Sequence, residues 1–222
     1  MTEKKEEYKS IYGYQKNSLS WSSYSKWKSG KEGYRDQYYH PERPRFETPE
    51  TIFGKKIGKY LEEDHPEVKH VEKYKNPEHK ISVEIEGIKV IGYLDNFDPV
   101  KKRFLEYKTS HKTKDGKHNW TDLAVSKHKQ LDFYSMLIQE KYGTVQNQCK
   151  LIYLETQESY IHYKGRQLEA VNKGLKLTGE VKEFKRTIAQ WERDAIKRDI
   201  IKVAKEIQED YERFRKNNQG AL

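Results

Sequence analysis

Apolar residues recur at helical spacing in three long stretches, and each stretch predicts a helix. The first follows Thr48-Pro49, an N-cap with proline at the first helical position, and should end near Glu63. The second is expected from about Thr121 to Tyr142, where Gly143 would close it. The third covers about 188–215. Three long helices separated by strand-like segments are typical of a fold that mixes helices with one sheet.

Alternating or continuous apolar runs predict the strands. Two of them flank Gly87 and should form a hairpin, and a turn over 98–101 leads into the next. The expected strands cover 81–86, 88–95, 103–110, 147–156, 159–165 and 181–187. Their order relative to the helices predicts an α/β (α+β) fold, with a central mixed sheet flanked by helices and a long C-terminal helix.

The chain is expected to consist of a polar arm, residues 1–17, and a single domain, residues 18–222, whose core covers about 48–165. Residues 1–45 hold seven of the 17 tyrosines and two of the four tryptophans, together with ten Lys or Arg. Ser20 could cap a short helix that carries Trp27, followed by a loop that contains Arg35. The aromatic residues could clamp this segment onto the core, Trp27 and Arg35 could contact nucleic acid, or both could hold.

The composition favours a polyanionic partner. Charged residues make up 36% of the chain and the mean hydropathy is −1.14, but 13% of the residues are aromatic, which argues against a disordered protein. The formal net charge is +9. Because tyrosine, tryptophan and lysine together suit stacking on bases, nucleic acid is a better candidate than a membrane surface.

Cys149 is the single cysteine, so the chain can form no internal disulfide, iron–sulfur cluster or cysteine-rich zinc site. The first ten residues contain no apolar signal region, and no apolar run has the length of a membrane span. A soluble protein of the cytoplasm, in a bacterial or phage-infected host cell, is therefore expected.

Three charged residues are expected to meet on one side of the sheet. Glu106 and Lys108 share a strand face, and pairing across the turn at 98–101 places Asp95 opposite Phe104, diagonal to Glu106. An ion pair on a solvated sheet is one interpretation. The other is a Mg²⁺ or Mn²⁺ site, because two converging carboxylates and a backbone carbonyl, here that of Tyr107, suit such a cation. Lys108 would then orient a water or stabilise the transition state.

These residues resemble a known nuclease core. IGYLD, a short gap and FLEYKTS are similar to the PD-(D/E)XK nuclease superfamily, with Asp95 as the aspartate and Glu106-Tyr107-Lys108 as its E-x-K. Lys127, Gln130 and Tyr134 are expected on one face of the helix that follows, and the last two match the Q-x-x-x-Y pattern of the RecB-like and phage exonuclease branch. The resemblance implies a restriction-endonuclease-like core and a catalytic set of Asp95, Glu106, Lys108, Gln130 and Tyr134. The alternative for the last two is an ordinary amphipathic helix with a buried tyrosine.

The sequence departs from that branch in the helix before the sheet. Many RecB-like members have G-x-x-x-H there, and the histidine binds the metal. Here the run begins at Gly54 and has Gly58 in place of the histidine. Glu62 lies one turn further on and could supply a carboxylate instead, or it could be a solvated residue at the helix end.

Basic residues cluster around the predicted site. Nine Lys or Arg and three acidic residues lie between Pro99 and Gln130. The expected DNA contacts in this region are Lys112, Lys114, Lys117, Trp120 and Lys127. The segment 110–120 would follow phosphates, with its tryptophan available for stacking. A solvated loop is the alternative.

The resemblance implies a metal-dependent deoxyribonuclease, most simply an exonuclease of recombination, repair or phage DNA processing. A DNA-binding module with impaired catalysis and a structure-specific endonuclease of the same fold are the alternatives. Mg²⁺ or Mn²⁺ is the expected cofactor and DNA the expected partner. A homo-oligomer and a recombination partner protein stay open.

Overall fold

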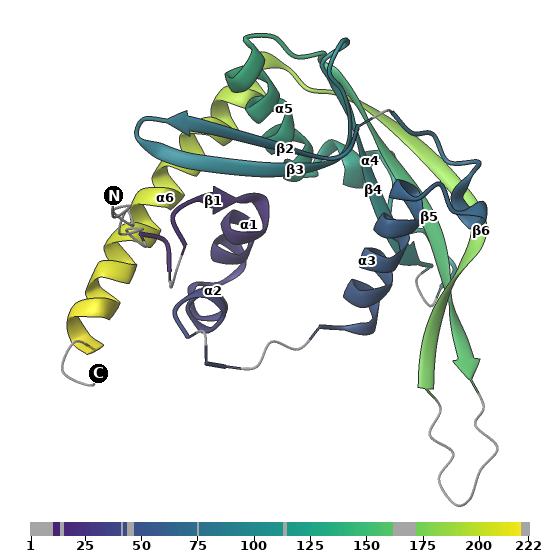
Figure 1. The fold of residues 1–222 in the computed structure, drawn as a ribbon, viewed down its shortest axis with the longest axis horizontal. Coiled ribbons are helices and arrows are strands. Elements are labelled where there is room, and N and C mark those ends of the chain that lie inside the picture. Colours follow the sequence, from purple (N-terminus) through teal and green to yellow (C-terminus); the bar gives the residue numbers. More distant parts are fainter. Residues whose placement is uncertain are drawn as a thin grey trace, which may run out of the picture.

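The computed structural model describes residues 11–13, 16–40, 42–43, 47–74, 76–112, 115–161 and 172–218. A six-stranded sheet lies at its centre, with helices against both faces and a long C-terminal helix (Figure 1). The strands β1, β3, β4, β5 and β6 are neighbours in that order, and β2 pairs with β3. The predicted fold class is confirmed.

The sheet is mixed because β1 and β4 have parallel partners, β3 and β5 respectively, whereas all other pairs are antiparallel. The strands are β1 (Leu19–Ser20), β2 (Asn76–Ile85), β3 (Ile88–Asp98), β4 (Arg103–His111), β5 (Gln148–Ile161) and β6 (Asn172–Thr187). The prediction of two separate strands, 147–156 and 159–165, is wrong as far as Ile161, because β5 continues without a break from Gln148 to Ile161. Residues 162–165 lie outside the described part of the chain.

The helices are α1 (Trp21–Ser29), α2 (Lys31–Tyr38), α3 (Pro49–Glu62), α4 (Asp122–Ser126), α5 (Lys129–Tyr142) and α6 (Gln190–Asn218), with a short 3₁₀ turn, η1 (Pro66–Val68). The start predicted for α3 is confirmed, since the Thr48 side chain accepts from the Thr51 N–H. Gly143 closes α5 in a left-handed conformation, also as predicted. The loop predicted for 31–38 is wrong, because that segment is α2.

The helices pack on the two faces of the sheet through two separate apolar cores. On one face, Phe53, Ile57 and Leu61 of α3 pack on Leu105 and Ile152 of the sheet. On the other face, α5 and α6 cover the sheet together with the aromatic side chains of α1 and α2. α3 and α5 therefore lie on opposite faces of the sheet, so a site at the ends of β3 and β4 can take residues from both helices.

Close packing at Gly92 fixes α5 against β3. A Cβ atom at this position would lie 2.5 Å from Cδ1 of Leu137 and 3.2 Å from Cε1 of Tyr134. The missing side chain therefore lets α5 approach the sheet and brings Tyr134 to β3. The same tyrosine meets the ring of Phe104 edge to face, with ring centroids 6.0 Å apart.

Segments from the two ends of the sequence pack together. Tyr12, within the predicted polar arm, is fully buried, and Gln208 of α6 donates to its hydroxyl. Trp27 of α1 and Tyr39 after α2 also bond to α6. None of the described helices combines the length and apolar character that a bilayer span requires.

Candidate active site

A cavity of about 520 Å³ opens between α3 and the adjoining ends of β2, β3 and β4. Asp95, Glu106, Lys108 and Gln130 all line it. The structure thus brings together four of the five residues predicted to be catalytic. The fifth, Tyr134, lies directly behind Gln130.

The strand register differs from the predicted one by two residues. Asp95 was expected opposite Phe104, but Phe104 pairs with Phe97 and Leu105 with Asn96, and the same register continued by one residue places Asp95 beside Glu106. A shift of two keeps every side chain on the same face of a strand, whereas a shift of one would have reversed it. The predicted convergence of Asp95 and Glu106 on one side of the sheet is therefore found, although the residue predicted to lie opposite Asp95 is wrong.

The β3–β4 ladder ends at the site. One edge of β3 pairs with two strands in turn: with β1 at Val90 and Ile91, and with β4 from Asn96 onward. Beyond the last β3–β4 pair, Asn96 with Leu105, the backbone N–H of Tyr107 donates to Oδ2 of Asp95 at 2.8 Å. Because N–H and C=O of one strand residue point to the same side, the Tyr107 carbonyl is also directed toward the opening beside β3. This is the placement that the predicted metal ligand requires.

Glu106 is buried, and only one of its two carboxylate oxygens is hydrogen-bonded within the described part of the chain. Its side chain is 1% exposed, and its Oε2 atom has no hydrogen-bond partner among the described residues. Burial, and then the nearby charge of Asp95, raise the pKa of Glu106 to about 8. Burial also raises the pKa of Asp95. Carboxylates in this state fit a hard divalent cation, which would supply the missing partner and offset the repulsion.

Lys108 belongs to a chain of hydrogen bonds. Its Nζ donates to Oε1 of Glu106 at 2.5 Å and to Oε1 of Gln130 at 2.9 Å. The Gln130 amide then donates to the hydroxyl of Tyr134 at 3.0 Å. Burial disfavours the ammonium, but the Glu106 and Asp95 carboxylates outweigh it and raise the pKa of Lys108. The lysine is therefore a charged and oriented donor.

The predicted helix 121–142 is broken, and the break positions Gln130. It divides into α4 and α5 at Lys127-His128. Arg186 of β6 holds the break: its Nη1 donates to the carbonyls of Val125 (3.3 Å) and His128 (2.8 Å). α5 therefore starts at a fixed point, one residue before Gln130.

The break also corrects the placement of Lys127. The prediction put it on one helical face with Gln130 and Tyr134, but it caps α4 and does not belong to α5. Its side chain is exposed. The expected alignment of the three residues is wrong, because the helical periodicity does not continue through the break.

Glu62 and Glu78 add two more carboxylates to the cavity lining. Burial, and then the neighbouring charge of Glu78, raise the pKa of Glu62. The tentative ligand Glu62 therefore does lie at the cavity. Sequence reasoning missed Glu78, because it follows Pro77 at the polar start of β2. No local pattern distinguishes it from an ordinary surface glutamate.

The two glycines of α3 line the same cavity. A Cβ atom on Gly54 would meet only Oγ1 of Thr109, at 3.7 Å, and one on Gly58 would meet nothing within 4 Å. No other part of the described chain therefore packs closely against this face of α3. The glycines leave open space in front of the carboxylates.

Trp27 does not stack on bases in this structure. It is 3% exposed, and its Nε1 donates to Oε2 of Glu206 at 3.1 Å. Its ring meets Tyr34 edge to face. The predicted DNA contact is wrong for this residue, because both the ring and the N–H face the protein interior. The alternative, an aromatic clamp on the core, is the arrangement found.

Arg35 is likewise engaged within the protein. Its guanidinium binds Asp210 of α6 through two bonds, Nε to Oδ2 at 2.9 Å and Nη2 to Oδ1 at 2.5 Å. The Tyr39 hydroxyl donates to the same carboxylate. The fork geometry that would recognise a phosphate is already satisfied. Arg35 therefore joins the two ends of the chain.

Arg35→Ala is expected to lower the free energy of unfolding by about 1–3 kcal/mol at neutral pH without weakening DNA binding. The Arg35 bonds hold the pKa of Asp210 below its ordinary value of 3.8. A carboxyl with a lowered pKa contributes stability above the unfolded pKa and loses it as the pH falls through the folded pKa. The difference from wild type should therefore shrink in acid. Urea unfolding at neutral and successively lower pH measures it.

Arg213→Ala is the matched control, because Arg213 is 73% exposed and lies 3.8 Å from the same carboxylate. Its effect should stay within about 0.5 kcal/mol. Loss of DNA affinity in Arg35→Ala at unchanged stability would restore the original prediction for this residue.

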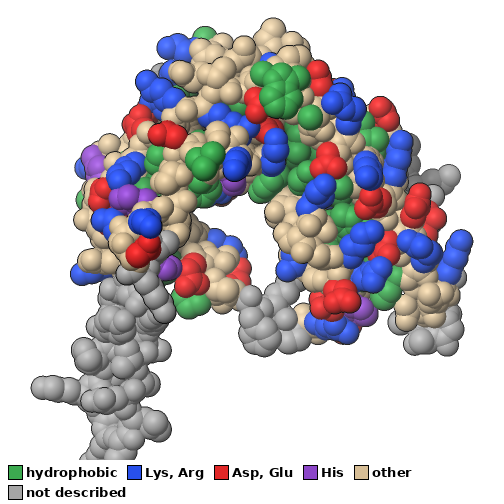
Figure 2. Space-filling view, turned by 180° about the vertical axis from the view of Figure 1, so that it is seen from behind, with side chains coloured by type: hydrophobic (Ala, Val, Ile, Leu, Met, Phe, Trp, Pro, Cys, Tyr) green, Lys and Arg blue, Asp and Glu red, His purple; other side chains and the backbone are tan. Residues whose placement is uncertain are grey.

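The basic segment before α4 is partly neutralised. Lys112 forms ion pairs with Glu155 (3.1 Å) and Glu180 (3.6 Å), and Lys117 pairs with Asp115. Lys114 lies outside the described residues. On the face shown in Figure 2, Lys and Arg side chains are interspersed with Asp and Glu.

Trp120 is half-buried and packs on the core, with its ring edge to face with His128 at 4.9 Å. It supports the α4–α5 break more directly than it presents a surface for bases. The DNA contacts predicted for Lys112, Lys117, Trp120 and Lys127 stay predictions.

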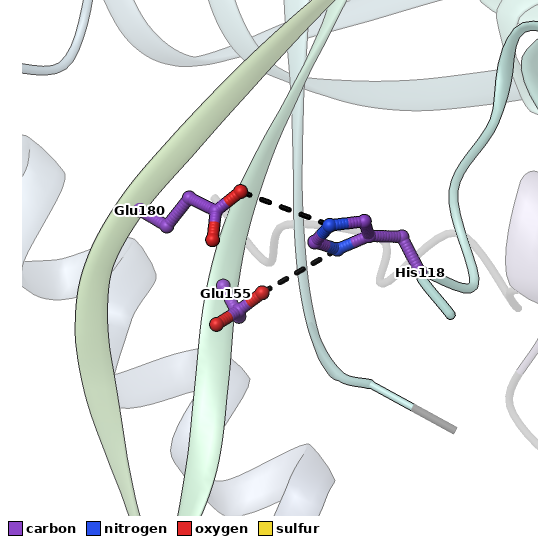
Figure 3. Close-up of side chains that lie close together, drawn as sticks. All are labelled: His118, Glu155 and Glu180. Atoms are coloured by element: carbon purple, nitrogen blue, oxygen red, sulfur yellow. Dashed lines mark ion pairs between the residues drawn. The ribbon is translucent and has the colours of Figure 1, made fainter. Parts of the chain in front are cut away.

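A second group of ligand-type side chains lies beyond the cavity. Figure 3 shows His118 between Glu155 of β5 and Glu180 of β6, at 3.4 and 3.7 Å. Lys112 and Lys182 pair with the same carboxylates. Two lysines already balance the two glutamates, so a cation would have to displace them, and we do not assign one here.

A family model described as the PD-(D/E)XK nuclease superfamily matches residues 27–219. Among solved structures, an alkaline exonuclease from Laribacter hongkongensis is 9% identical with a TM-score of 0.52, and the match covers 93% of this chain and 95% of that one. A phage-related exonuclease from Haemophilus somnus is 15% identical with a TM-score of 0.49, covering 87% and 82% of the two chains. Among curated proteins, no sequence matches this one.

Proposed function

The chain belongs to the PD-(D/E)XK nuclease superfamily, and on that premise we propose that it is a Mg²⁺- or Mn²⁺-dependent deoxyribonuclease that hydrolyses phosphodiester bonds. One observation carries the proposal. A buried glutamate, Glu106, has an unpartnered oxygen in a cavity that it shares with Asp95 and a charged lysine. An ion pair on a solvated sheet would leave neither a buried carboxylate nor a cavity.

The cation would be held by the carboxylates of Asp95 and Glu106 and by the Tyr107 carbonyl, with Glu62 available across the cavity. When bound, it would stabilise negative charge on the phosphate and favour ionisation of a water. The ligand set consists of hard oxygens, which Mg²⁺ and Mn²⁺ prefer. Cys149 is buried against the carbonyl of Arg186 and takes no part in the cavity.

Lys108 would act on the substrate directly. Two of its three N–H groups are engaged by Glu106 and Gln130, which leaves the third for a phosphate oxygen or the attacking water. Gln130 and Tyr134 act through the lysine: the glutamine accepts from Nζ, and the tyrosine fixes the glutamine. We therefore assign Lys108 as catalytic, and Gln130 and Tyr134 as positioning residues.

Exonuclease action in recombination, repair or phage DNA processing is the specific form that we propose. The alkaline exonuclease from Laribacter hongkongensis shares the fold over nearly the whole of both chains.

A DNA-binding module with impaired catalysis is the second candidate, and Gly58 favours it. This glycine lines the cavity where the RecB-like pattern has a histidine, and it contributes no ligand. Such a module would retain Asp95, Glu106 and Lys108 as an unused cation site.

Incubation with linear and circular DNA, in Mg²⁺, in Mn²⁺ and in chelator, tests the proposal. We expect metal-dependent degradation of the linear DNA alone. Nicking of circles would indicate an endonuclease instead. Binding without cleavage in either metal would support the impaired module.

A further inference from the structure

An exposed aromatic side chain lies just outside the cavity. Of the aromatic residues that the structure describes, only Tyr93 and Trp191 are exposed, by 49% and 67%. Trp191 belongs to α6, whereas Tyr93 lies on β3, two residues before Asp95. Two residues of a strand span roughly 7 Å. Tyr93 is therefore close enough to contact a nucleotide whose phosphate lies at Asp95.

Tyr93 points to the side of the sheet on which the cavity lies. Its neighbours Gly92 and Leu94 are buried, and a Cβ atom on Gly92 would meet Leu137 of α5. Because side chains alternate along a strand, Tyr93 faces away from α5, toward the side that α3 covers elsewhere. α3 also lines the cavity. Tyr93 belongs to neither apolar core, so this part of the sheet is open to solvent.

The ring of Tyr93 has one neighbour. Lys80 is directly opposite on β2, and its Nζ lies 5.8 Å from the centre of the ring. Within the described ranges, no aromatic ring packs on Tyr93, its hydroxyl forms no hydrogen bond, and Lys80 forms no ion pair. A cross-strand pair on a solvated sheet would account for the lysine, but it leaves the other face of the ring open.

The cavity itself repels phosphates. Lys108 is the one basic residue of its lining, which carries a formal charge of −4 when all of its acids are ionised, namely Glu50, Glu62, Glu78, Asp95 and Glu106. One divalent cation would offset half of that charge. Contacts that hold a nucleotide here must therefore lie outside the lining and include some that do not depend on charge. Stacking of a base on an aromatic ring is such a contact, and it tolerates any sequence.

We propose that Tyr93 stacks on an unpaired base of the DNA strand whose phosphate lies at the cavity, and that Lys80 binds a neighbouring phosphate. The inference rests on the proposed function and extends it to the class of substrate. A base reaches an exposed ring only when it has left its partner strand. The bound DNA is therefore single-stranded beside the cavity, as a free strand or as the opened end of a duplex.

Binding of a fluorescent single-stranded oligonucleotide, followed by anisotropy with Mn²⁺, tests the stacking. Glu106→Gln serves as the parent protein, so that the strand is not consumed. We expect Tyr93→Ala to weaken binding by about 5- to 100-fold. Tyr93→Phe should bind as the parent does, because the hydroxyl has no partner. Trp191→Ala is the matched control, since it removes the other exposed aromatic side chain from a helix that does not line the cavity.

A series of oligonucleotides, each with one abasic site, identifies the base that stacks. At one position near an end, loss of the base should weaken binding to the parent but not to Tyr93→Ala, because ring and base act as a pair. Lys80→Gln should lower the slope of log affinity against log salt concentration by about 0.7. Tyr93→Ala should leave that slope unchanged.

Equal affinity of Tyr93→Ala and its parent for the single strand would overturn this inference. An equal loss at every abasic position, together with a lower unfolding temperature of Tyr93→Ala, would assign the residue a structural role and overturn it as well. Either result leaves the proposed function intact if wild type still cleaves DNA with Mg²⁺ or Mn²⁺. Absence of cleavage in wild type would overturn the proposed function itself, whatever the effect of Tyr93→Ala on binding.

Discussion

Replacing Glu106 by glutamine is expected to lower the rate of DNA cleavage by about a thousandfold or more. Glutamine fills the same buried space, but it lacks the charge that holds the cation. A loss of about 4 kcal/mol in transition-state stabilisation corresponds to this factor. Initial rates on linear duplex DNA in Mn²⁺ measure the effect. DNA affinity, followed by fluorescence anisotropy in the same buffer, should change little.

The stability of that variant gives an independent check. Because burial and Asp95 already disfavour the charged form of Glu106, the neutral amide should not lower the free energy of unfolding in chelator. Glu84→Gln, on the exposed side of β2, should leave cleavage unchanged. If Glu106→Gln cleaved DNA at the wild-type rate, the reaction could not occur at this cavity.

Arg186→Met should give the largest loss of stability among the variants considered, about 3–5 kcal/mol. Arg186 is 6% exposed, and its guanidinium pairs with Asp132, which is fully buried, and with Glu192. Methionine fills much of the space but leaves the Asp132 carboxylate with Lys129 as its main cation. Urea unfolding should show the loss, and the melting temperature should fall by roughly 6–20 °C.

The double variant Arg186→Met with Asp132→Asn should recover part of that stability, because the uncompensated buried charge is then gone. Arg186→Lys keeps the charge but not the two-pronged guanidinium geometry, so its free energy of unfolding should lie between those of wild type and Arg186→Met. A loss below about 1 kcal/mol in Arg186→Met would mean that the network contributes little.

The centre of the candidate site could be predicted from the sequence because it depends on strand alternation. Asp95, Glu106 and Lys108 reach one face in any register of the same parity, so an error of two residues did no harm. The start of α3 was equally local, since Thr48 and Pro49 specify it without reference to the rest of the chain. The family motif lies within these local features.

What could not be predicted depends on contacts distant in sequence. The break before α5 is held by Arg186, 58 residues beyond the carbonyl of His128. The role of Arg35 is determined by Asp210, 175 residues away. Glu78 belongs to the cavity only because β2 pairs with β3. Propensity and periodicity contain none of this information, and they extended a helix through a break that a remote side chain imposes.

The packing of α1 and α2 against α6 has a consequence for how the chain folds while it is being synthesised. α1 and α2 leave the ribosome before their partner α6, which is translated about 175 residues later. At usual elongation rates this delay lasts roughly 9 to 35 seconds. Throughout it, the aromatic side chains of the N-terminal segment lack the surface that finally covers them. Docking of α1 and α2 on α6 therefore has to wait until α6 has been synthesised, and a ribosome that stalls before α6 leaves their aromatic side chains uncovered.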